Sequence, residues 1–103
     1  MVLPEEVENE LSSAQEALSD GNIGKARVCA RRAVGNAFRL SKHFTEFRKV
    51  LSAIEIVKLV GSSETFSLEV RKAALRLSAS VTEGKISEHP VKDALVIIEG
   101  LLL

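Results

Sequence analysis

The sequence has little of what stabilises small secreted domains or builds reactive sites. The 103-residue chain contains one cysteine, two prolines, and neither tryptophan nor tyrosine. A single cysteine cannot form an internal disulfide or a multi-cysteine metal site, so we expect a reducing, cytoplasmic location. The first residues are acidic where a signal peptide would be basic, and we expect no secretion signal.

Long hydrophobic runs and an excess of charge of one sign are also missing. The best candidates for a run of about 18 apolar residues are interrupted by Glu55, Lys58 and Glu99, which excludes a membrane span. The 14 basic and 14 acidic residues cancel. This balance argues against a protein that holds nucleic acid by overall charge alone. The length fits one domain, residues 1–103.

The sequence contains none of the common catalytic motifs HExxH, CxxC, GxSxG, GxGxxG or GxxxxGK[ST]. We expect His43 to face inward or to cap a helix end, and His89 to lie in a solvated loop before Pro90. We expect Cys29 to be buried and inert, with a reactive thiolate beside the neighbouring arginines as the alternative. We therefore nominate no catalytic residue, no metal ligand and no cofactor, and predict that the protein is not an enzyme.

Apolar residues recur with the 3.6-residue period of α-helices along nearly the whole chain. The pattern predicts helices over about residues 4–19, 24–41, 44–60 and 67–81, and from residue 90 to the end. Residues 53–57 also have strand propensity, but nothing nearby could pair with them. Because short connections favour antiparallel neighbours, we predict an all-α fold, an antiparallel up-down bundle of four to five helices. More than about two-thirds of the residues should be helical.

Two of these segments carry more apolar residues than one buried stripe requires. From Val50 to Val60 eight of eleven residues are apolar, and the last nine residues include only Glu99 and Gly100 as exceptions. Such a helix is either the centre of the bundle or covered by a partner. We favour the second alternative and expect a two-fold homodimer. The expected interface residues are Ile56, Val60, Ile97 and Leu101.

Charge is segregated along the chain although it sums to zero. Residues 1–20 contain six acids and no lysine or arginine, whereas residues 21–60 contain nine basic residues and two acids. A basic segment suggests a phosphate or nucleic-acid ligand, and the candidate ligand-binding residues are Arg27, Arg31, Arg32 and Arg39. On a helical wheel, however, these arginines flank the apolar seam in two rows. We favour neutralisation by first-helix acids such as Glu6 and Glu10, and a phosphate-binding surface is the alternative.

The segment 24–33 reads Gly-Lys-Ala-Arg-Val-Cys-Ala-Arg-Arg-Ala and follows an acidic helix and a glycine turn. It is similar to a helix of small prokaryotic proteins of uncharacterised function. More broadly, the chain resembles the HEPN (higher eukaryotes and prokaryotes nucleotide-binding) group. This resemblance implies a compact, often dimeric bundle of four helices and a short fifth. Active ribonucleases of that group have four to six residues between an arginine and a histidine. Only three separate Arg39 from His43, so ribonuclease activity is not implied for any residue.

These observations predict a non-catalytic helical binding or assembly module that self-associates. One alternative is a HEPN-like domain that binds nucleotide or RNA through the arginines of the second helix. Another is a helical-hairpin domain, similar to tetratricopeptide units, that recognises another protein. An enzyme whose site is completed by a partner chain is the least favoured alternative.

Overall fold

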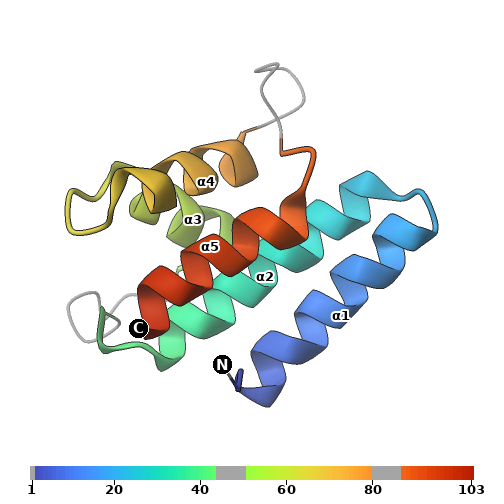
Figure 1. Ribbon diagram of the computed structural model, residues 1–103, viewed down its shortest axis with the longest axis horizontal. Coiled ribbons are helices and arrows are strands. Elements are labelled where there is room, and N and C mark those ends of the chain that lie inside the picture. Colours follow the sequence, from blue (N-terminus) through green and yellow to red (C-terminus); the bar gives the residue numbers. More distant parts are fainter. Residues whose placement is uncertain (1, 44–50, 80–86) are drawn as a thin grey trace.

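The computed structural model describes residues 2–43, 51–79 and 87–103 (Figure 1). These residues form five α-helices: α1 (Glu5–Ser19), α2 (Ile23–Leu40), α3 (Ala53–Ser62), α4 (Leu68–Ser78) and α5 (Pro90–Leu102). Of the described residues 78% are helical and none lies in a β-strand. The predicted all-α bundle and its high helix content are therefore confirmed. No helix in the described ranges is both long and apolar enough to cross a membrane.

Local hydrogen bonds set the helix ends. The N-cap side chains that accept a backbone hydrogen bond are Asn22 for α2, Ser52 for α3 and Ser67 for α4. The Glu55 carboxylate accepts in return from the Ser52 backbone N–H at 3.0 Å, which completes a capping box. Between α1 and α2, Gly21 adopts the left-handed φ of 75° expected of a glycine that ends a helix.

The third and fourth helices differ in extent from the prediction. Helix α3 begins at Ala53, because its capping box places Ser52 outside the helix. The prediction started this helix near residue 44, and residues 44–50 lie outside the described residues. Helix α4 ends at Ser78 rather than near Val81, which is also outside the described residues. Helix α3 also exposes Glu55 and Lys58 to solvent, so it is not apolar on all sides.

Two antiparallel hairpins and a fifth helix make up the bundle. Helix α1 pairs with α2, and α3 pairs with α4. Helix α5 packs against both α2 and α4 and touches α1. In Figure 1, α5 (red) runs in the same direction as α2, so the antiparallel order applies to the hairpins and to the α4–α5 pair.

The central helix is α2, which contacts all four other helices. Its buried side is largely alanine, and small side chains allow several helices to approach one axis closely. Fully buried alanines of α2 are Ala26, Ala30, Ala33 and Ala37. Larger core side chains come from α2 itself, at Val34 and Phe38, and from the facing helices, including Val7, Ile56, Leu77, Ile97 and Ile98. As the alternative to a dimer, the sequence pattern suggested that the third helix lies at the centre of the bundle. The structure places α2 there instead.

Candidate functional site

The four α2 arginines predicted to bind a ligand reach three separate places. Arg27 and Arg31 contact the C-terminal end of α4. Arg32 faces α1, and Arg39 reaches the residue before the N-cap of α3. They therefore do not share one surface on which a single phosphate backbone could lie.

At the end of α4, two arginines from α2 bind backbone carbonyls. Arg27 Nη2 donates to the carbonyl oxygen of Ala79, and Arg31 Nε donates to that of Leu77 at 2.8 Å. The last carbonyls of a helix have no intrahelical donor and carry the negative end of the helix dipole. The two guanidinium groups therefore stabilise the end of α4. We call this arrangement, Arg27 and Arg31 with the carbonyls of Leu77 and Ala79, the α2–α4 junction.

Among the described residues, no carboxylate forms an ion pair with the two arginines of this junction. Within the described residues, the ion pairs are Arg32–Glu10 and Arg76–Asp93. Arg27 is only 5% exposed, and its Nε atom has no hydrogen-bond partner. Burial, and secondly the charge of Arg27, lower the pKa of the Arg31 guanidinium below its usual value. The lowered pKa reflects two like charges held close together in a partly desolvated place.

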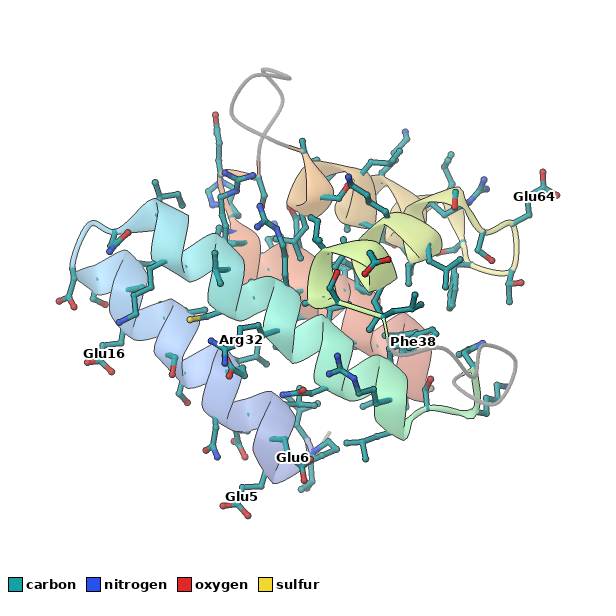
Figure 2. All side chains as sticks on the ribbon, turned by 180° about the vertical axis from the view of Figure 1, so that it is seen from behind. Glu5, Glu6, Glu16, Arg32, Phe38 and Glu64 are labelled. Atoms are coloured by element: carbon teal, nitrogen blue, oxygen red, sulfur yellow. The ribbon has the colours of Figure 1, made fainter. Side chains whose placement is uncertain are left out.

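The other two arginines are held at the surface. Arg32 Nε lies 3.6 Å from Glu10 Oε1, and Figure 2 shows Arg32 on the side of α2 that faces α1. Because the Arg32 side chain is 61% exposed, this pair contributes at most about 1 kcal/mol. Arg39 donates to the Asn36 side chain and to the Leu51 carbonyl oxygen, each at 3.1 Å. Neutralisation by acids of α1 thus involves one of these four arginines.

A buried polar cluster that the sequence analysis missed ties α4 to α5. Arg76 binds both carboxylate oxygens of Asp93, with Nη2–Oδ1 at 2.8 Å and Nε–Oδ2 at 3.2 Å. The fully buried Ser87 donates its hydroxyl to Asp93 Oδ2 at 2.7 Å, and its backbone N–H donates to the Arg76 carbonyl. The hydrogen bond to Asp93 raises the pKa of Arg76. The only sequence signal was an acid in the first turn of α5, which is equally typical of an exposed residue.

Two shallow pockets flank the first turn of α5 and share His89 and Lys92. One, of about 270 Å³, is also lined by Arg76, Glu88 and Asp93. The other, of about 300 Å³, extends to the C-terminal part of α1 and is mostly apolar. The first mixes cationic and anionic side chains, and the second offers few polar groups, so neither concentrates charge of one sign.

The histidines and the cysteine occupy ordinary structural positions. The His43 ring lies 4.9 Å from the Phe66 ring, centroid to centroid, at an angle of 57°. His89 is exposed and Cys29 is buried, as predicted. Across the described ranges there is no group of three or more His, Cys, Asp or Glu side chains that could hold a metal ion.

The four residues predicted to form a dimer interface lie inside the monomer. Exposed fractions are 1% for Ile56, 0% for Val60 and Ile97, and 3% for Leu101. These side chains are covered because α3 packs on α2 and α4, and α5 packs on α2 and α4. The expectation that they form an exposed apolar patch is wrong, and a second copy cannot use them while the bundle is intact.

Helix α4 carries the exposed apolar side chains that α3 and α5 do not. Leu68 is 57% exposed and Leu75 is 56% exposed. Residues seven apart lie on the same side of a helix, and the exposed Lys72 lies between them. Helix α4 forms an outer edge of the molecule (Figure 1). We call Leu68, Lys72 and Leu75 the outer face of α4.

Comparison with known proteins finds no matching family model, no matching curated protein and no matching solved structure. The resemblance to the HEPN group therefore stays a prediction.

Proposed function

We propose that the chain is a non-catalytic helical assembly module that pairs with a second copy of itself through the outer face of α4. The observation that carries this proposal is the exposure of two leucines, each more than half accessible, on one side of an edge helix. Exposed apolar side chains that share one helix face with polar residues around them are typical of protein interaction sites. A two-fold dimer is the commonest closed arrangement of identical chains.

The outer face of α4 is complementary to itself in an antiparallel pair. Leu68 and Leu75 lie about 10 Å apart along the helix axis. A two-fold axis between them places Leu68 of each copy beside Leu75 of the other. At 100° per residue, Glu69 and Arg76 lie on the same side of the leucine line. The same axis therefore brings Glu69 of one copy near Arg76 of the other, whose Nε and Nη2 also bind Asp93 of its own chain. This charge complementarity favours a second copy in antiparallel orientation as the occupant.

Light scattering with size-exclusion chromatography at micromolar concentration tests the proposal. We expect twice the 11.2 kDa chain mass for the wild type and a single chain mass for Leu75→Glu. The matched control is Leu40→Glu, a change at a leucine that is 53% exposed on α2 and should leave the dimer intact. Far-UV circular dichroism should show the same helix content in both variants. A wild-type monomer over this range, or equal effects of the two substitutions, would contradict the proposal.

A charge substitution tests the orientation of the pair. Glu69→Lys places a positive charge near Arg76 of the other copy and should weaken the dimer. The exposed Glu16 of α1 provides a control with the same charge change, Glu16→Lys, which should not alter the dimer. Dissociation constants from sedimentation equilibrium compare the two, and an unchanged constant for Glu69→Lys would argue against the antiparallel arrangement.

The two alternatives from the sequence have less support in the geometry. A nucleic-acid surface on α2 would require its arginines to face solvent together, whereas Arg27 is buried and the others are directed to different neighbours. A tetratricopeptide-like array stacks hairpins in an open series. Here α5 packs on both hairpins at once, which closes the bundle.

A further inference from the structure

The larger of the two pockets beside the first turn of α5 lies between that helix and α1. Its volume of about 300 Å³ is at the lower end of the range of about 300–1,000 Å³ found for small-molecule sites. The residues that line it come from the C-terminal part of α1 and from the N-cap and first turns of α5: Gln15, Leu18, His89, Val91, Lys92 and Leu95. Helices α1 and α5 touch each other, and both pack on α2 (Figure 1). We call this space, which two helices form and a third supports, the α1–α5 pocket.

The walls of the α1–α5 pocket are apolar. Leu18 contributes from α1, and Val91 and Leu95 contribute from α5; all three side chains are half-buried. They therefore keep apolar surface in contact with water, and a ligand that covers this surface gains the free energy of removing it from water. On α5 the lining extends from His89 to Leu95, which is about 9 Å along the helix axis. The pocket therefore fits an elongated apolar group.

Two accessible hydrogen-bond donors mark the end of the pocket nearer to the start of α5. The Lys92 and His89 side chains are exposed and line the pocket. The lysine ammonium group is positively charged, and a histidine ring offers an N–H donor. Leu95 lies almost one helical turn beyond Lys92, so the apolar wall continues away from the donors. The pocket thus combines a polar end that suits an anion with an apolar body.

We propose that the α1–α5 pocket binds an aliphatic carboxylate. Its carboxylate group lies at Lys92 and His89, and its hydrocarbon chain lies along Leu18 and Leu95. One negative charge matches the single lysine, whereas a doubly charged phosphate would be repelled more strongly by Glu88, which lines the adjoining pocket. The pocket contains no residue of the outer face of α4, so this ligand goes beyond self-association and can bind whether or not the chain dimerises.

Titration with sodium octanoate at constant ionic strength, followed by two-dimensional NMR spectra of the backbone amides, tests the site. We expect saturable shifts at Gln15, Leu18 and Leu95, with a Kd of about 1–10 mM for a ligand of this size. Acetate has the carboxylate without the chain, and octylammonium has the chain with the opposite charge. Both should bind at least about threefold more weakly than octanoate. Absence of saturable shifts at these amides, or equal binding of octanoate and either control, would overturn the proposal.

A charge substitution tests the polar end of the pocket. Lys92→Gln removes the positive charge and should raise the Kd for octanoate at least about threefold without weakening octylammonium. Lys58→Gln removes the same charge from an exposed lysine of α3 and should leave both constants unchanged. Equal effects of the two substitutions on octanoate would show that only the overall charge matters, and the proposal would be wrong.

An apolar substitution tests the wall of the pocket. Leu18→Gln should raise the Kd for octanoate at least about threefold, because the chain loses an apolar contact. The matched control is Leu40→Gln, at an exposed leucine of α2 outside the pocket, which should not change this constant. An unchanged Kd in Leu18→Gln would place octanoate elsewhere and overturn the proposal. Because Lys92 is exposed, Lys92→Gln decides the question even if Leu18→Gln destabilises the fold.

Discussion

Replacing Asp93 with alanine should destabilise the fold more than the loss of an exposed acid from the same helix. Asp93 is 5% exposed and accepts hydrogen bonds from the Arg76 guanidinium and from the hydroxyl of Ser87, which is 0% exposed. Without the carboxylate, the Ser87 hydroxyl is left buried with no acceptor at this position. Arg76 loses the anion that holds it between α4 and α5.

The magnitude follows from the burial of the two donors. An unpartnered buried hydroxyl costs about 1–3 kcal/mol. The Arg76 side chain is 49% exposed, so its lost ion pair costs only about 1 kcal/mol because water replaces the carboxylate. We therefore expect the free energy of unfolding to fall by about 2–4 kcal/mol. A domain of this size has a total of about 5–15 kcal/mol, so Tm should fall by about 10–20 °C.

Urea unfolding followed by far-UV circular dichroism measures this change. The control is Glu99→Ala, because Glu99 is an exposed acid on α5 and its removal should change the free energy by less than about 0.5 kcal/mol. Ser87→Ala should cost about 1 kcal/mol, because the carboxylate keeps its bond with Arg76. Equal midpoints for Asp93→Ala and Glu99→Ala would refute the reasoning.

Two further predictions concern helix packing and a helix cap. Gly100→Ala should lower the free energy of unfolding by about 1–3 kcal/mol, because the new Cβ would lie 2.8 Å from Cγ2 of the rigid Val70 side chain. Gly35→Ala, whose Cβ would lie 3.5 Å from its nearest atoms, should raise the free energy of unfolding by up to about 1 kcal/mol. Urea unfolding compares the two variants. Destabilisation in both would contradict this contrast. Hydrogen bonds to the backbone N–H and hydroxyl of Ser52 lower the pKa of Glu55. The contribution of Glu55 to the free energy of unfolding should therefore be full at pH values above the carboxyl pKa of the unfolded chain. It should be lost as the pH falls through the lower pKa that Glu55 has in the folded chain. Urea midpoints measured over about pH 3 to 6 should fall less steeply toward acid in Glu55→Gln than in the wild type, and parallel curves would exclude this role.

The sequence by itself determined where most helices begin and end. Ser67 and Gly21 act on backbone groups within a few residues, so their effect can be read without knowing the rest of the fold. The capping box of Ser52 and Glu55 is equally local, but the apolar residues before it suggested a longer helix. The alanine positions of α2 and the burial of Cys29 were likewise predictable, because a helical period fixes which residues share a face.

Only the tertiary structure decided which faces met and which charges were paired. Arg27 and Arg31 bind carbonyls 52 and 46 residues further along the chain, and no local pattern specifies such contacts. Ile56 and Ile97 were predicted to lie at a dimer interface. The packing of α5 across both hairpins instead places both side chains in the core of the monomer. The same packing buried Asp93 against Arg76 and left α4 at the edge. Sequence periodicity defines the apolar side of each helix, but the arrangement of the helices determines how much of that side is covered, because burial depends on neighbours distant in sequence.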